Sequence, residues 1–298
     1  MKVAVPAWRL TVTDPMKRKV PRSSRVPVHR TVKAYVNGAF IRSESGRTYR
    51  IHSASGPVDV PDCSRKDARD AIRAARAAGE RWAASSAYLR GQILYRLAEM
   101  LENAPQLTSF AADLALPKDP NEAAADLIAH YAGFTDKLGQ ILGSTNAVAG
   151  HASSTEPLGV GVCVVHLPDS ASLLDLLEAS AAALAAGNAV IISTGGAAGA
   201  LACTLAERIA VSDLPAGLWQ VLPSSRPEVI KTLAGSTDVR ALDVLNHPER
   251  GPLERLATHS LTKIRHAAPR EEYSRSHRSL ASIRWQIDYK TVLGPIGK

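Results

Sequence analysis

The sequence has few aromatic residues, which make up 5% of its 298 residues, although 45% of the residues are hydrophobic. Aromatic side chains supply much of the buried area of most cores, so this core has to be built from many small aliphatic side chains, mainly alanine. No uninterrupted apolar run reaches the roughly 18 residues that a membrane-spanning helix needs. The N-terminus lacks the basic and then apolar pattern of a secretory signal, so a cytoplasmic protein with no membrane association is expected.

Cysteine is also scarce, with three residues in the chain. Cys63, Cys163 and Cys203 form no Cys-x-x-Cys pair and have no histidines at metal-ligand spacing, so neither a disulfide framework nor a metal site is predicted. Unpaired cysteines usually behave as small buried apolar residues. We therefore expect three reduced and buried thiols rather than a nucleophile.

The net charge of +8 comes from one end of the sequence. Residues 1–33 hold nine of the 36 basic residues and one of the 28 acidic residues, so the remaining chain carries 27 of each sign. Residues 1–31 have no periodic apolar face, which predicts a disordered basic arm. We favour a solvated extension, and binding of RNA, lipid or an acidic partner through this arm is the alternative.

The segment 156–193 has the pattern of a strand, a helix and a second strand. Residues 160–165 are an apolar run, and residues 170–186 carry leucines among alanines at helical spacing. Gly187-Asn188 is a helix-ending signal before the β-branched residues 190–192. Two buried parallel strands joined by a crossover helix indicate an α/β fold.

Further elements extend this pattern on both sides. Asn37-Gly38 between two β-prone runs predicts a hairpin, and Ser64 with Asp67 forms a capping box that starts a helix. A doubly wound parallel sheet with an N-terminal helical region follows from the whole series. The predicted helices cover residues 64–78, 86–102, 121–142, 198–210, 226–234 and 253–258, and the later strands cover residues 218–222 and 239–244.

The C-terminal region predicts a linker and a strand. Residues 265–282 are rich in arginine and poor in apolar residues, which is typical of a linker. Apolar Ile283, Trp285, Ile287 and Tyr289 then alternate with polar residues, so residues 283–298 are predicted to be a strand.

Several of these strings resemble the aldehyde dehydrogenase family. The resemblance covers residues 32–264 and 283–298, and it implies a Rossmann-like nucleotide-binding domain with a hairpin arm, followed by a C-terminal strand that helps to bridge subunits. The matching strings are Glu156-Pro157-Leu158-Gly159-Val160, Ala183-Leu184-Ala185-Ala186-Gly187-Asn188, Tyr35-Val36-Asn37-Gly38-Ala39-Phe40, and the ending Lys290-Thr291-Val292-Leu293-Gly294-Pro295-Ile296-Gly297.

The resemblance implies chemistry that this chain does not carry. Family members place a catalytic domain with the nucleophilic cysteine before the terminal strand, where this chain has only residues 265–282, too few for a domain. The family's general base lies in a Glu-Leu-Gly-Gly string, whereas residues 261–264 lead on without a glutamate. The family's Pro-Trp-Asn string, whose asparagine holds the substrate oxyanion, is replaced by residues 168–170, Pro-Asp-Ser, and a carboxylate there repels a developing negative charge.

The cofactor-binding strings of the family are replaced as well. Its Lys-Pro-Ser-Glu string, which binds the adenosine ribose, is Ser-Thr-Gly-Gly at residues 193–196, and its helix-opening Gly-Ser string corresponds to residues 247–252, with a proline and an acid. No catalytic, cofactor-binding or metal-binding residue is therefore assigned, and no cofactor is expected. A phosphate site at the glycine-rich turn 195–199 is an open alternative. A Ser-His-Asp site among the scattered histidines lacks a nucleophile-elbow string.

These observations lead to the hypothesis of a catalytically inactive aldehyde dehydrogenase-like protein, a pseudoenzyme that acts as a structural or regulatory subunit. It would assemble with itself or pair with a full-length aldehyde dehydrogenase, because unpaired strand edges need cover. The predicted interface residues are Trp285, Ile287, Tyr289 and Leu293. The alternatives are an NAD(P)-dependent oxidoreductase of weak or altered activity, and a binding protein that acts through the basic arm, although nucleic acid is not an expected partner.

Deletion of residues 1–30 is expected to leave the fold intact, because this arm lacks a periodic apolar face. Circular dichroism and thermal melting of the shortened protein check this expectation. Any nucleic-acid affinity of the full chain should be lost with the arm and should fall steeply with added salt, since counterions are released on binding. A shortened protein that does not fold would contradict the assignment.

Overall fold

The computed structural model describes residues 30–53, 56–104, 119–148, 150–245, 250–267 and 280–295. The predicted disordered arm, residues 1–31, lies outside these ranges except for its last two residues, which form β1. In chain order the elements are β1 (Arg30–Thr31), β2 (Ala34–Val36), β3 (Ala39–Ile41), β4 (Thr48–Ser53), β5 (Gly56–Pro61), α1 (Arg65–Ala84), α2 (Ala87–Glu102), α3 (Pro120–Ala132), α4 (Leu138–Leu142), β6 (Ser144–Val148), β7 (His151–Gly159), β8 (Val162–His166), α5 (Leu173–Ala185), β9 (Ala189–Thr194), α6 (Gly196–Ile209), β10 (Trp219–Pro223), α7 (Pro227–Ala234), β11 (Val239–Leu245), α8 (Arg250–His259), β12 (Lys263–Ala267), α9 (Leu280–Arg284) and β13 (Ile287–Pro295).

The centre of the molecule is a seven-stranded sheet in the order β12-β11-β8-β9-β10-β2-β3. The strands from β12 to β10 are parallel, and the hairpin β2–β3 adds two antiparallel strands beside β10. From β8 the chain adds β9 and β10 on one side and then returns to add β11 and β12 on the other. The predicted α/β, doubly wound Rossmann-like fold is confirmed.

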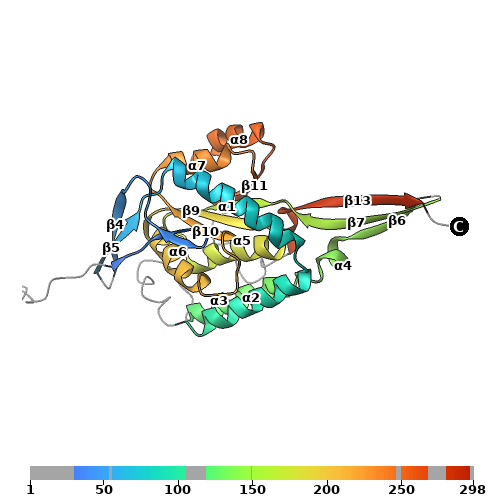
Figure 1. Ribbon diagram of the computed structural model, residues 1–298, viewed down its shortest axis with the longest axis horizontal. Coiled ribbons are helices and arrows are strands. Elements are labelled where there is room, and N and C mark those ends of the chain that lie inside the picture. The colour runs from blue at the N-terminus through green and yellow to red at the C-terminus, as the bar shows by residue number, and fades with distance from the viewer. Residues whose placement is uncertain are drawn as a thin grey trace, which may run out of the picture.

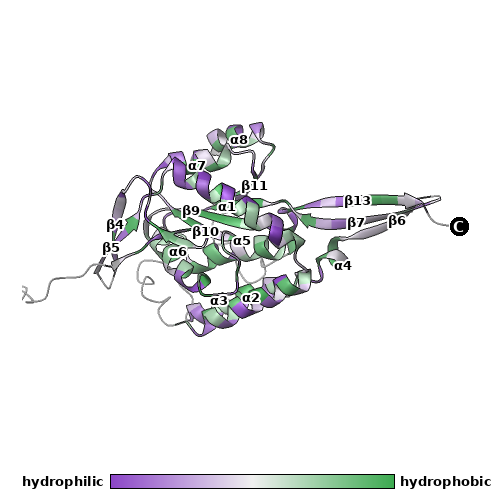
Figure 2. Ribbon diagram, in the orientation of Figure 1, coloured by the Kyte–Doolittle hydropathy of each residue, from purple (hydrophilic) through white to green (hydrophobic). Residues whose placement is uncertain are grey.

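Helices cover both faces of this sheet (Figure 1). Helix α1 packs on β8, β9 and β10 and is joined by α7 and α8, whereas α5 and α6 pack on the opposite face. Helices α2 and α3 form an outer layer against α5. Figure 2 shows apolar colour along the central strands and polar colour on the outer helix α1, as expected for a three-layer protein with one core.

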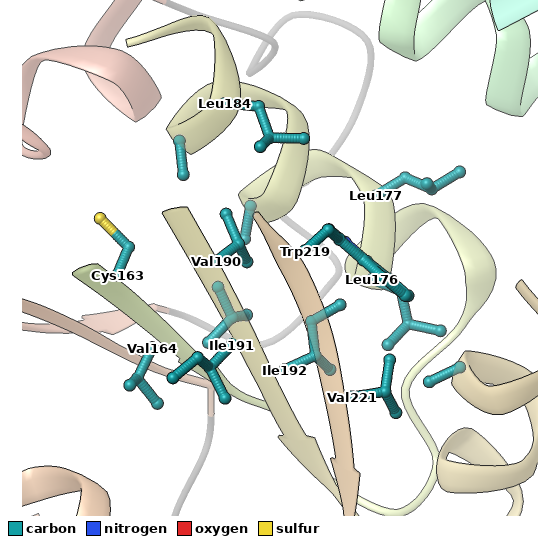
Figure 3. Close-up of a cluster of buried hydrophobic side chains, with 14 of the residues drawn as sticks. Cys163, Val164, Leu176, Leu177, Leu184, Val190, Ile191, Ile192, Trp219 and Val221 are labelled. Carbon is teal, nitrogen blue, oxygen red and sulfur yellow. The ribbon is translucent and has the colours of Figure 1, made fainter. Parts of the chain in front are cut away.

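The predicted strand, helix and strand of residues 156–193 are β8, α5 and β9. All six residues of β9 are buried, because helices lie on both of its faces. Figure 3 shows Leu176 of α5 beside Trp219 of β10, and Leu176 is fully buried. Alanines between the leucines keep α5 thin, which lets the helix lie close to the sheet.

The N-terminal predictions are confirmed at the hairpin and at the capping box. Asn37 and Gly38 have φ angles of 51° and 78°, as a tight two-residue hairpin turn requires. Ser64 caps α1, and the side chain of Asp67 accepts from the Ser64 amide at 2.7 Å. The single helix predicted over residues 121–142 is wrong, because the chain ends α3 at Gly133 and starts the separate short helix α4.

Residues 156–160 and 183–188, the two strings of this region that resemble the family, come together at the buried side chain of Asn188. Its Oδ1 accepts from the Gly161 amide at 2.8 Å, and its Nδ2 donates to the Gln286 carbonyl at 2.9 Å. Gly159 has no room for a side chain here, since a methyl group would be 2.7 Å from Asn188 Oδ1. Asn188 is 0% exposed. Its amide therefore connects the start of β8 to the segment that leads into β13.

The terminal strand begins at Ile287, so the prediction of a strand from Ile283 is wrong for its first residues. Leu280 and Ile283 have helical spacing and pack into the core, and Gln286 donates from Nε2 to the Ser282 carbonyl at 2.8 Å. This helical packing prevails over the period-two alternation that the sequence shows. The ends of the predicted linker 265–282 belong to β12 and α9, and residues 268–279 lie outside the described ranges.

A second sheet has three strands in the order β13-β7-β6, and we call it the arm. Each strand runs antiparallel to its neighbour, and β13 pairs with β7 over nine residues, from Ile287 opposite Gly159 to Pro295 opposite His151. The arm extends well beyond the body of the molecule (Figure 1). The other two strands of the arm, β6 and β7, are adjacent in the chain.

The variant Asn188→Asp is expected to destabilise the fold by about 3 to 5 kcal/mol, because a carboxylate would be buried with no cation and would face the Gln286 carbonyl. The loss should shrink as the pH falls below neutral, since burial raises the pKa of such a carboxyl and the protonated acid carries no charge. Urea unfolding from pH 4 to pH 8 measures both effects.

The control for this variant is Asn103→Asp, which changes an exposed residue at the end of α2. It should cost no more than about 1 kcal/mol, the range for one charge at a helix end. Equal losses for the two variants would contradict the role of Asn188.

Candidate functional site

A ligand-binding site is expected at the carboxyl edge of the parallel sheet. Open α/β sheets bind ligands outside the carboxyl ends of their strands, where the direction of winding reverses. That reversal lies between β8 and β11 in this chain. Residues 246–249, which follow β11, and residues 268–279, which follow β12, lie outside the described ranges. The described part of this edge therefore consists of the segments after β8, β9 and β10.

His166 and Ser193 form a pair at the ends of β8 and β9. The Nδ1 atom of His166 is 3.2 Å from Ser193 Oγ, within hydrogen-bond distance. Ser193 is 2% exposed and lies inside the regular strand β9 rather than on a sharp turn. A serine nucleophile has to be reachable by its substrate, so this pair joins two neighbouring strands and does not form a hydrolase site.

Asp169 lies at the amino end of α6, beside the glycine-rich turn. Ala198 donates its amide to the Asp169 backbone carbonyl at 3.0 Å. A methyl group added to Gly195 would be 2.5 Å from Asp169 Oδ1, and one added to Gly196 would be 2.6 Å from Asp169 Cβ. A carboxylate is favourable at the positive end of a helix. It also repels an anionic ligand from that end.

Tyr49 of β4 closes the same turn from the other side. Its hydroxyl donates to the Gly196 carbonyl at 3.3 Å. Burial raises the pKa of Tyr49 far above its ordinary value, and the neighbouring Cys203 and Asp169 add to this effect. A phenol that stays protonated serves as a fixed hydrogen-bond donor and not as a base.

Asp62 and Arg226 form an ion pair beyond the end of β10. Arg226 Nε is 3.0 Å from Asp62 Oδ2, and the guanidinium also donates to the Cys63 carbonyl at 2.8 Å. Asp62 Oδ1 accepts from the Ser224 hydroxyl at 3.1 Å and from the Ser225 amide at 3.0 Å. Asp62 and two of the three guanidinium nitrogens of Arg226 are bonded within the chain, so the pair anchors β10 to the start of α1.

A hollow of about 590 Å³ lies beside β12 and has a partly basic lining. Lys263 Nζ is 2.6 Å from Asp288 Oδ1, and His266 Nε2 is 3.0 Å from Glu254 Oε1. Arg265 pairs with Asp243 of the neighbouring strand and lies over the ring of Trp285, 4.5 Å from the ring centroid. The charges of β12 thus have partners within the chain, and the strand contains no acidic residue that could act as a base.

Comparison with known proteins identifies the fold. The profile of the aldehyde dehydrogenase family matches residues 41–246, more than half of the chain. The chain belongs to the aldehyde dehydrogenase family. It is 30% identical over 229 residues to hydroxyisobutyraldehyde dehydrogenase from Mycolicibacterium austroafricanum, covering 73% of this chain and 44% of that protein. It is 32% identical over 248 residues to cytosolic 10-formyltetrahydrofolate dehydrogenase from Pongo abelii, covering 77% of this chain and 27% of that protein.

Solved aldehyde dehydrogenase structures have the same fold. The enzyme from Brucella melitensis biovar abortus 2308 superposes with a TM-score of 0.71 at 23% identity, covering 80% of this chain and 51% of that chain. The NAD+ complex of aldehyde dehydrogenase from Bacillus cereus gives a TM-score of 0.72 at 21% identity, covering 80% and 51%. The chain spans about half or less of the length of these relatives.

The three cysteines of this aldehyde dehydrogenase relative are all buried. Cys163 lies in β8 (Figure 3), Cys203 lies in α6, and Cys63 precedes the first turn of α1. Burial raises the pKa of each thiol, and neighbouring carboxylates such as Asp67 near Cys63 add to this effect. Because the thiolate is the reactive form, none of the three positions suits a nucleophile.

The four predicted interface residues divide into two pairs. Ile287 is 2% exposed and belongs to the core of its own chain, and Trp285 packs against that core between α9 and β13. Trp285 is therefore not on the strand face that the sequence predicted. Tyr289 is 49% exposed and Leu293 is 59% exposed, both on the arm. Val292 is 56% exposed on the other face of β13. The sequence did not indicate this residue, because the predicted interface was based on the apolar residues of one strand face only.

The described residues contain neither a metal-binding cluster nor a membrane-spanning helix. No group of three or more His, Cys, Asp or Glu side chains there is placed to hold a metal ion. Among the helices in the same part of the chain, none combines the length and apolar character needed to cross a membrane.

The three native thiols are expected to stay unmodified by a thiol reagent at pH 8 and to react fully once the protein is unfolded in guanidinium chloride. Raising the pH to 9 should change little, because the raised pKa values keep the thiols protonated where an ordinary cysteine of pKa about 8.5 ionises. A Val211→Cys variant, placed at a side chain that is 67% exposed, supplies a reactive control. A native thiol that reacts as fast as this control would contradict the assignment.

Proposed function

We propose that this chain is a non-catalytic member of the aldehyde dehydrogenase family that serves as a structural or regulatory subunit. It assembles through the arm, either with itself or with a full-length aldehyde dehydrogenase. The observation that carries the proposal is that the arm extends from the body and leaves three apolar side chains largely exposed. Tyr289, Val292 and Leu293 are each about half exposed or more, at 49%, 56% and 59%.

The residues at the carboxyl edge of the sheet support a non-catalytic role. The exposed carboxylate of Asp169 lies at the amino end of α6, and Gly195 and Gly196 offer no charged side chain for a ribose or a phosphate. The described residues therefore do not fit NAD at this end of the sheet. The three buried thiols are poorly placed as nucleophiles for aldehyde oxidation, and β12 contains no acidic residue that could act as a base.

The arm supports assembly because an isolated three-stranded sheet is a poor structure for a monomer. Most residues of β7 and β13 are exposed or half-buried, so neither face of the arm is covered over most of its length. Small sheets need a packed face for stability. A partner on the arm supplies that face and buries the exposed apolar side chains.

The proposal predicts that deleting residues 288–298 lowers the molar mass in light scattering while the circular dichroism of the body is kept. The deletion leaves the buried Ile287 in place, so the core is not disturbed. Deletion of residues 1–29 is the matched control and should leave the mass unchanged. Co-expression with a tagged full-length aldehyde dehydrogenase then shows whether the two proteins purify together.

Two results would argue against the proposal. One is a monomeric protein that also fails to co-purify with a full-length relative. The other is aldehyde turnover by the purified chain together with stabilisation by NAD, which at a hundred times the dissociation constant adds about 2.7 kcal/mol to the folded state. That second result would favour the alternative, an oxidoreductase of altered activity.

A further inference from the structure

The strand β13 presents one edge of its backbone to no other described strand. The Val160 amide donates to the Gln286 carbonyl at 3.3 Å, and the register continues with Ile287 opposite Gly159. Hydrogen-bonded and non-hydrogen-bonded pairs alternate along an antiparallel ladder, so every second residue of β13 from Ile287 onward directs its N–H and C=O groups away from β7. These residues are Ile287, Tyr289, Thr291, Leu293 and Pro295.

The exposed apolar side chains of one face fall on the same residues. Tyr289 and Leu293 are placed symmetrically about Thr291, two positions to either side. All three lie on one face of the arm, because every second side chain of a strand points to the same face. On this face Thr291 Oγ1 is 2.8 Å from Oγ1 of its cross-strand neighbour Thr155. The open backbone edge and the apolar face are therefore both symmetric about Thr291.

We propose that β13 pairs antiparallel with β13 of a second copy of this chain about a two-fold axis at Thr291. Two three-stranded arms become one continuous six-stranded sheet. The inference rests on the proposed assembly function and names the partner and the register. Tyr289 of one copy lies opposite Leu293 of the other, and this contact occurs twice, so the most exposed apolar side chains of this face cover one another.

The first residue of β13 is compatible with this register. Ile287 lies opposite Pro295 of the second copy, and a proline has no N–H to donate to the Ile287 carbonyl. Lys263 of the same chain makes up for this loss, because its Nζ donates to the Ile287 carbonyl at 2.7 Å. The one outward carbonyl that the second copy cannot satisfy is thus satisfied within the monomer.

Other registers are less favourable. A slip by one residue sets outward-facing groups against residues that already bond to β7. A slip by two residues in one direction puts Lys290 directly opposite Lys290, which is destabilising. A slip by two in the other direction puts Tyr289 opposite Pro295 and leaves the first residues of β13 without a partner. The register centred on Thr291 pairs the whole strand.

The test is disulfide trapping of the full chain carrying Thr291→Cys. At the two-fold axis the two Cα atoms lie about 5.5 Å apart, which a disulfide spans. The matched controls are Lys290→Cys and Val292→Cys. Each of these residues lies about 7 to 8 Å from its own symmetry mate, which is too far. The three native cysteines are buried and do not interfere.

We expect a covalent dimer on non-reducing gels for Thr291→Cys under mild oxidation, and at least tenfold less for either control alone. A mixture of the two control variants should cross-link again, since Lys290 lies opposite Val292 of the other copy. Thr291→Pro should halve the molar mass in light scattering without loss of circular dichroism, because this N–H points away from β7 and proline is tolerated at such edge positions.

Three results overturn the pairing, and they are distinguishable from failure of the proposed function. An oligomer that is lost on deleting residues 288–298 but not trapped by Thr291→Cys means that the arm assembles in another way, and only the pairing falls. Cross-linking of Lys290→Cys with itself as efficient as that of Thr291→Cys likewise refutes this register. A monomeric wild-type chain at micromolar concentrations removes the pairing, while co-purification with a full-length relative still tests the function.

Discussion

The buried amide of Asn188 holds the body and the arm in one geometry. It bonds the Gly161 amide and the Gln286 carbonyl at once, so the entry to β8 and the approach to β13 are fixed against the same side chain. Gly159 is required beside it because nothing larger than hydrogen fits. The direction in which β7 and β13 leave the body is therefore set by a few buried polar contacts, each costly to leave unmade.

At the carboxyl edge of the sheet the described polar groups bond mainly to one another, while the fold of the family is kept. The fold depends on apolar burial along β8, β9 and β10 and on the capping of the helices, and these features are intact. This edge carries Asp169 beside the α6 turn and the Asp62–Arg226 ion pair. Polar groups that satisfy one another stabilise the edge but leave few donors for a ligand.

The arm differs from the body in having few buried side chains. Its apolar residues are exposed on both faces, Tyr289 and Leu293 on one and Val292 on the other. Exposed edges favour pairing with another strand. Lys290 and Pro295 limit the ways in which that pairing can occur. An arm of this composition fits the proposed role in assembly.

The sequence by itself determined the family, the order of the central strands and helices, the hairpin turn at Asn37-Gly38 and the helix start at Ser64, because each depends on local chemistry or on period. It also indicated that the cysteines would be buried. Tertiary structure alone decided the rest. Leu280 and Ile283 became helical because the core accepts them at helical spacing, which removed Trp285 from the strand. Asp169 came to lie against the α6 turn, and Asn188 met Gln286 across the fold, because contacts between residues far apart in the chain depend on how the layers pack and leave no periodic pattern in the sequence.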